Sequence, residues 1–316
     1  MNNKYFKIVG YSVTIVCIVF LIYRLSRFSL DFSQLLEVHV FFIVAIITFF
    51  YSLYLLLLPL VWRETIRITT EVSCSYFETA FVYLRSNLMK YIPGNVFQYI
   101  GRNEIAVRKG LNHAEVALST VLEVAAVVAA TAITAVCLYF RGFQNWLEQN
   151  TLRLTYLLIA VVCVLVLGFA CIYIFRKKLS GFIKKIASLF RLRIFARFVV
   201  CVAFDMVLSI ITAVLFLTVL ILILGFTASF EVYIQIMGAY LISWLAGFLT
   251  PGSPGGIGVR EVAITAILSD QVGSDIIMPG IIIYRIVTTV GDFLAFAISA
   301  VLLKVHTRIS AQKSSL

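Results

Sequence analysis

Charged residues are scarce in this chain. Only 13% of its 316 residues are Asp, Glu, Lys or Arg, whereas 62% are hydrophobic and the mean hydropathy is +1.03. A soluble domain cannot bury so much apolar surface, so this composition excludes a water-soluble globular protein. We expect a single all-α transmembrane domain over residues 1–316.

Patterns for metal, disulfide and nucleotide chemistry are also missing. None of the six cysteines forms a CxxC pair, and the three histidines lie far apart in the sequence. The glycine-rich stretch GGIGVRE lacks the third glycine and the Lys-Ser/Thr ending of nucleotide motifs. We therefore assign no catalytic or metal-binding residue and expect no cofactor. We attribute the net charge of +11 to residues that set the orientation in the membrane, not to nucleic-acid binding.

Long apolar runs are abundant. Crossing about 30 Å of hydrocarbon takes roughly 20 residues, and six runs are long enough: 6–23, 38–61, 114–140, 152–175, 198–224 and 279–303. The first follows a basic start without a small-residue cleavage site, and we interpret it as a retained helix. Two further apolar regions, 72–113 and 231–278, are interrupted by proline and glycine and predict re-entrant hairpins.

The basic residues predict an orientation. With both termini in the cytoplasm, 20 of the 26 Lys and Arg fall in inner segments and five in outer ones. This count requires 231–278 to enter and leave on the outer side. The basic segment 176–197 has apolar residues on one helical face, which favours a linker helix on anionic headgroups. An orientation-setting loop explains it equally well.

The two broken regions resemble each other. When YIPGNVFQYIGRNE (91–104) and LTPGSPGGIGVRE (249–261) are aligned on their Pro–Gly pairs, Arg102 meets Arg260. The flanking spans run in opposite directions, so we predict an inverted repeat, with pseudo-repeats over about 38–140 and 198–303. Paired broken segments in oppositely oriented halves mark the sites of transporters. The backbone breakers are Pro93, Gly94, Pro251, Gly252, Pro254, Gly255, Gly256 and Gly258.

The second bend has the chemistry of an anion site. Free amides before a helix starting near Val259 attract anions, and Arg260 can add a bidentate grip on phosphate or carboxylate. A plain interfacial turn, with Glu261 complementing the helix dipole, is the alternative.

Four charged residues lie inside apolar spans: Glu123, Asp205, Arg285 and Asp292. Each costs about 2.5–3.5 kcal/mol at a helix centre on insertion scales. We predict that they face a polar interior, with Glu123 pairing with Arg285, and that they form a substrate or proton path. Buried ion pairs that only hold the bundle together are the alternative.

With these motifs in place, the chain resembles the flippase-like transmembrane domain of lysylphosphatidylglycerol synthetase/flippases, which also occurs as stand-alone proteins. The resemblance covers about residues 5–305 and rests on FLTPGSPGGIGVRE, YRIVTTVGD and KYIPGNVFQYIGR. It implies a multi-pass protein of a bacterial or archaeal inner membrane that moves a lipid with a charged headgroup. It places Gly255, Gly256, Gly258 and Glu261 in the second broken hairpin, Arg285 in the following span and Arg102 in the first hairpin. Together with the anion-site chemistry of Arg260, this leads us to expect a substrate site at Arg102, Arg260, Glu261, Arg285, Gly255, Gly256 and Gly258.

The expected function is therefore translocation of an anionic, aminoacylated or polyprenyl-phosphate lipid, without enzymatic activity. No aminoacyl-transfer domain follows residue 316, so we do not expect lipid lysylation. Two alternatives remain: a membrane transferase for polyprenyl-linked sugars, for which we see no DxD pair, and a non-transporting accessory of glycan or lipid assembly. The sequence leaves a homo-oligomer open.

Overall fold

The computed structural model describes residues 38–70, 72–91, 97–107, 110–149, 192–250 and 254–314, and every regular element in these ranges is a helix. The predicted spans 6–23 and 152–175 lie outside these ranges. So do the linker up to residue 191, the Pro93–Gly94 pair and the Pro251–Gly252 pair.

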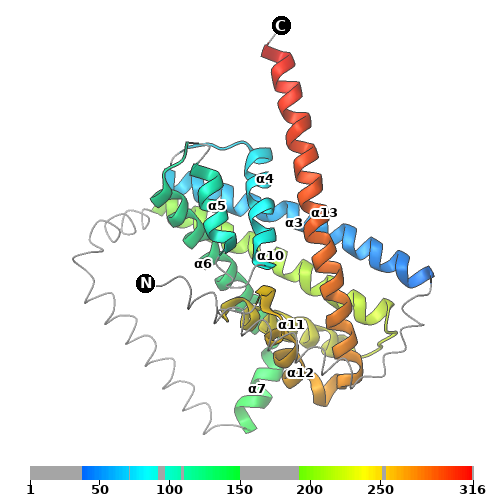
Figure 1. Cartoon of the computed structure of the whole chain (residues 1–316). Coiled ribbons are helices and arrows are strands. Elements are labelled where there is room, and N and C mark those ends of the chain that lie inside the picture. The colour runs from blue at the N-terminus through cyan, green and yellow to red at the C-terminus, as the bar shows by residue number, and fades with distance from the viewer. Residues whose placement is uncertain are drawn as a thin grey trace, which may run out of the picture.

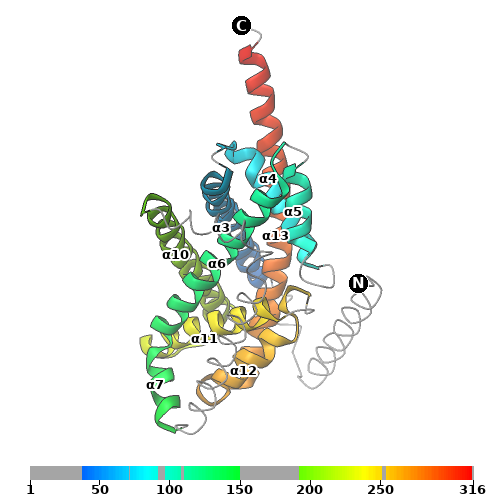
Figure 2. The ribbon, with the colours of Figure 1, turned by 90° about the vertical axis from the view of Figure 1, so that its left-hand side faces the viewer.

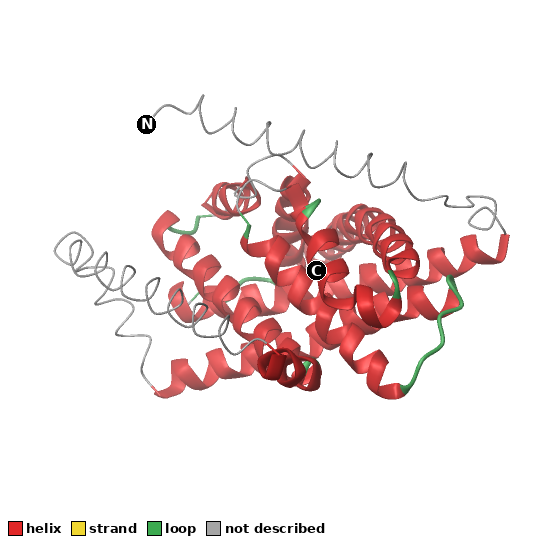
Figure 3. Cartoon of the chain, turned by 90° about the horizontal axis from the view of Figure 1, so that it is seen from below, coloured by secondary structure: helices red, strands yellow, loops and turns green. Residues whose placement is uncertain are grey.

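Four long helices build the bundle: α3 (Val38–Thr70), α6 (His113–Leu138), α10 (Leu192–Leu222) and α13 (Ser274–Ser314). They contain the predicted runs 38–61, 114–140, 198–224 and 279–303, apart from a few terminal residues. α10 begins at Leu192, so the last part of the predicted linker belongs to this helix. α3 packs against α6, α10 and α13, and Figure 3 shows the described helices and the loops between them from below.

Two broken hairpins complete the described part of the chain. The first hairpin consists of α4 (Tyr76–Asn87), the 3₁₀ turn η1 (Leu88–Tyr91) and α5 (Phe97–Val107). The second consists of α11 (Phe230–Leu249), η2 (Pro254–Gly256) and α12 (Val259–Val272). The predicted start of α12 at Val259 is confirmed. In both ribbon views, α4 and α5 lie toward the end where α13 finishes, and α11 and α12 toward the other end (Figures 1 and 2), while η1 and η2 touch.

Five of the described helices are long and apolar enough to cross a membrane, and α11 is one of them. We expected α11 only as an arm of a hairpin. Its 20 residues extend about 30 Å at 1.5 Å per residue, which is why it passes the same test as the spans. The short helix α7 (Phe140–Gln149) follows α6 at the end of the bundle near α12.

Small residues and aromatic rings set the packing. A Cβ at Gly291 would lie 2.5 Å from a Tyr51 ring carbon, and one at Gly280 would meet the end of the Leu220 side chain, so glycine lets α13 lie close to α3 and α10 at these two positions. Beside these contacts the rings of Phe216 and Tyr240 stack at 4.8 Å. Large exposed side chains such as Phe41, Val200 and Phe293 cover the outside of the helices, as expected for surfaces in contact with lipid.

Candidate functional site

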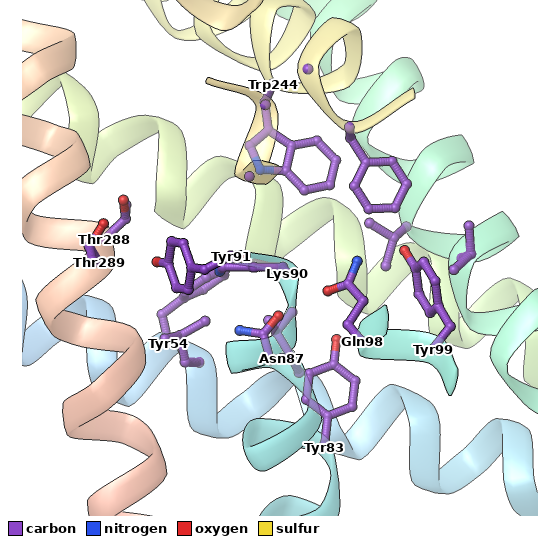
Figure 4. A pocket seen from close by; sticks show the side chains of 18 of the residues that line it. Tyr54, Tyr83, Asn87, Lys90, Tyr91, Gln98, Tyr99, Trp244, Thr288 and Thr289 are labelled. Atoms are coloured by element: carbon purple, nitrogen blue, oxygen red, sulfur yellow. The ribbon is translucent and has the colours of Figure 1, made fainter. Parts of the chain in front are cut away.

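A polar cavity of about 140 Å³ lies where the two hairpin tips meet α3, α6 and α13. In Figure 4, Tyr83 and Asn87 of the first hairpin and Trp244 of α11 enter it from opposite sides, and Thr288 and Thr289 of α13 close one flank. Five charged side chains also line it: Lys90, Arg102, Glu123, Arg260 and Arg285. Most of the residues expected at the substrate site are therefore brought together here.

Arg102 of the first hairpin is paired with Glu123 of α6. Its Nη1 donates to Glu123 Oε2 at 2.9 Å, and the Tyr83 hydroxyl donates to Oε1 at 2.8 Å. The guanidinium also lies over the ring of Tyr83, at 4.1 Å from its centroid. Both charged side chains are at most 5% exposed, so this pair is a buried joint between the first hairpin and α6.

Arg285 of α13 is paired with Glu261 of the second hairpin. Its Nε donates to Glu261 Oε1, and its two Nη atoms donate to the carbonyls of Gly255 and Gly256 at 3.1 and 2.9 Å. Glu261 Oε2 accepts from the Gly258 amide at 2.7 Å. The bend therefore presents carbonyls to Arg285, and one of the amides expected to hold an anion is occupied by Glu261.

These two ion pairs correct the predicted partnership of Glu123 with Arg285. In each half, the charge in the long helix pairs with the hairpin that precedes it, at Arg102–Glu123 and at Glu261–Arg285. The signs are exchanged: the first hairpin supplies the cation, and the second supplies the anion. The predicted pairing failed because sequence spacing locates a charge along its helix but not the neighbour it faces.

Asp292 connects α13 to the tip of the first hairpin. It accepts from Lys90 Nζ at 2.6 Å, from Asn87 Nδ2 at 3.0 Å and from the Tyr91 hydroxyl at 2.5 Å. Lys90 was not among the residues predicted from the sequence. Its position three residues before the Pro93–Gly94 break could have indicated a charged group at the tip of the first hairpin. This cluster joins the two predicted repeats directly.

Arg260 has no acidic partner among the ion pairs of the described residues. Its Nε is buried without a hydrogen-bond partner, and its guanidinium lies 5.5 Å from the centroid of the Trp244 ring. A Cβ at Gly247 would lie 2.5 Å from its Cγ, and one at Gly256 2.7 Å from its Nε, so two glycines make room for the side chain. Burial and the like charge of Arg285 both disfavour the charged form of Arg260, whereas Glu261 attracts it without forming an ion pair with it.

The charges around the cavity leave one cation uncompensated. Lys90, Arg102 and Arg285 each have a carboxylate within ion-pair distance, whereas Arg260 has none among the described side chains. An unpaired guanidinium that borders a polar cavity can bind a phosphate or carboxylate by donating two parallel hydrogen bonds to it. The arrangement suits a single anionic group.

An apolar groove of about 620 Å³ runs beside this cavity between α5 and α6. Tyr99 and Val124 line both spaces, while Ile100, Ala117 and Val121 line only the groove. At one end, His113 Nδ1 and Asn103 Oδ1 lie 2.6 Å apart. A charged cavity and an apolar groove thus share a wall of two residues.

One expected site residue, Asp205, does not line the central cavity. It lies on α10 and forms no ion pair with the described residues, and its side chain is buried with Oδ2 lacking a hydrogen-bond partner. Pro254 begins η2, whereas Pro93, Gly94, Pro251 and Gly252 are outside the described residues.

Among the described residues, no three His, Cys, Asp or Glu side chains gather as they would around a metal ion. Comparison with protein-family models, curated proteins and solved structures finds no match to this chain. We therefore infer a function from the cavity and from the residues around it.

Proposed function

We propose that this protein moves a lipid with an anionic headgroup across the membrane and binds the headgroup in the central cavity through Arg260. The observation that carries the proposal is the uncompensated guanidinium beside three ion pairs. Keeping a buried cation without a partner is costly, so a site that retains one is best explained by an anion that arrives from outside.

The neighbouring groove favours a lipid over a soluble anion. A lipid needs a polar space for its headgroup and an apolar path for its chain, and Tyr99 and Val124 belong to both. The hydrocarbon chain would lie between α5 and α6 while the headgroup reaches Arg260. The resemblance to lysylphosphatidylglycerol flippases supports the same substrate class.

The hairpins supply the two gates in this proposal. Alternating access needs a barrier on each side of a fixed site. The first barrier would be the tip of the first hairpin, which Asp292 holds through Lys90, Asn87 and Tyr91. The second would be the bend held by Arg285. Opening one of them at a time would expose Arg260 to one side of the membrane. An inner membrane with both termini in the cytoplasm is part of this proposal.

The test is translocation of a labelled anionic phospholipid by the purified protein in liposomes. R260Q should slow it roughly ten- to hundredfold, since a hydrogen bond to a charged group is worth about 1.5–3 kcal/mol. R67Q is the matched control, because it removes one positive charge from a side chain that is 53% exposed and remote from the cavity. Wild-type rates in R260Q, or no translocation by the wild-type protein, would refute the proposal.

A further inference from the structure

Asp205 is the intramembrane charge that the headgroup site does not use. Its side chain is 3% exposed, and no ion pair of the described residues includes it. Its Oδ2 is buried and makes no hydrogen bond. The other intramembrane charges, Glu123, Arg285 and Asp292, all have partners of opposite sign. A buried carboxylate with one oxygen unsatisfied and no ion-pair partner among the described residues is unfavourable, and a ligand that removes its charge would relieve this cost.

A small second cavity lies at this carboxylate. Its volume is about 20 Å³, enough for one water molecule. Four side chains line both this cavity and the central one: Tyr54, Leu58, Val127 and Trp244. A single layer of side chains therefore separates Asp205 from the space beside Arg260.

The oxygen atoms around Asp205 favour a proton over a metal ion as this ligand. The Thr131 and Ser209 hydroxyls lie 3.1 Å apart and hydrogen-bond to each other. The Thr212 hydroxyl is engaged by the hydroxyls of Tyr240 and Tyr284 at 3.2 and 3.0 Å. In the described part of the chain Asp205 belongs to no group of three His, Cys, Asp or Glu side chains that could hold a metal ion, whereas a proton needs only Oδ2 of the carboxylate.

The helices that surround Asp205 contribute acids, a thiol or phenols. Among the described residues, none of these helices contributes a cation that forms an ion pair with Asp205. Cys201 lies one turn before Asp205 and interacts with it and with Glu64 of α3. Tyr54 of α3, Tyr83 of α4 and Glu123 of α6 also interact with Asp205 electrostatically. α11 and α13 contribute the phenols of Tyr240 and Tyr284, which reach Thr212. Glu123 is neutralised by Arg102.

We propose that Asp205 is a proton-binding site whose occupancy is coupled to the anionic headgroup in the central cavity. This inference rests on the proposed function. An anion beside Arg260 and an ionised Asp205 repel each other across the shared wall, so a bound headgroup raises the affinity of Asp205 for a proton. By linkage, a bound proton favours the headgroup equally. One proton taken up on one side and released on the other then accompanies one lipid.

Infrared spectroscopy of the protein in vesicles tests the proton site without any transport. A carboxylic-acid C=O band should titrate with pH, grow at fixed pH when anionic lipid replaces zwitterionic lipid, and be absent in D205N. D275N is the matched control, because Asp275 is exposed at the start of α13. If D205N does not fold, D205E should shift the frequency of the band. A band that stays unchanged in these variants, or no titrating band in the wild-type protein, overturns the site.

Translocation under a pH gradient tests the coupling. One pH unit should accelerate wild-type and D275N protein up to about tenfold in the direction of proton flow. D205N should lose this response to the pH gradient, and an equal response in D205N overturns the coupling. If wild-type protein moves no lipid at all, the proposed function fails, whereas the infrared titration still decides whether Asp205 binds a proton.

Discussion

Two arginines at equivalent positions of the two broken regions have opposite environments. Arg102 is 2% exposed and bound to Glu123, whereas Arg260 has no carboxylate partner among the described residues. The sequence placed both at the same offset from a Pro–Gly pair and suggested the same role. Their neighbours separate them: Arg102 meets an acid from α6, and Arg260 meets Trp244 and two glycines. We therefore interpret Arg102 as structural and Arg260 as the ligand-binding residue.

The structural role of Arg102 gives the first stability prediction. R102L leaves the Glu123 carboxylate buried without its cation and should lower the free energy of unfolding by about 3–5 kcal/mol. The double variant R102L/E123L should recover most of this loss, because it removes the uncompensated charge as well. Denaturant unfolding in detergent measures both effects. If the free energy of unfolding lost in the double variant equals the sum of the losses from the two single substitutions, a direct interaction between Arg102 and Glu123 is contradicted.

At the scale of the elements, much of the fold could be predicted from the sequence. Apolar length located α3, α6, α10 and α13, and the proline and glycine breaks located both hairpin tips. The contacts between elements could not be predicted, because hydropathy and spacing carry no information on which helix faces which. The cluster of Asp292 with Lys90 joins residues more than 200 positions apart and was missed for that reason.

The tip of the second hairpin depends on glycine for two separate reasons, which two variants can distinguish. Gly256 has φ +74° and lies against Arg260, whereas Gly110 has φ +92° with open space around it. Both G256A and G110A should lose roughly 1–2 kcal/mol of stability to left-handed backbone strain, and G256A should lose more, because its Cβ would lie 3.0 Å from the Cα of Gly247. Only G256A should also displace Arg260 and impair headgroup binding. Equal lipid translocation by the two variants would contradict this placement of Arg260.

The cluster at Asp292 should hold the first hairpin against α13. K90M removes the cation from a carboxylate whose side chain is fully buried. Amide hydrogen exchange in residues 76–91 should therefore become at least several-fold faster, while exchange in α12 stays unchanged. K304M, which alters a lysine near the exposed end of α13, provides the control. Unchanged exchange in K90M would show that this pair does not secure the hairpin.

For the whole molecule, the proposed function depends on two hairpins that approach from opposite ends of the bundle and touch at η1 and η2. A charged cavity with one unpaired cation lies where they meet, and in the proposed function the neighbouring groove would give a hydrocarbon chain a path to it. The concentration of basic residues in the predicted inner segments predicts an orientation with the first hairpin toward the cytoplasm. This orientation decides whether the two bends can act as opposite gates.

Site-specific cysteine labelling in intact cells tests this arrangement most directly. In a cysteine-free background, A114C follows the first hairpin and T227C precedes the second, and both positions are exposed. A membrane-impermeant maleimide should label T227C from outside, and A114C only after the membrane is permeabilised. Labelling of both cysteines from the same side would contradict gates on opposite faces and, with them, the transport mechanism.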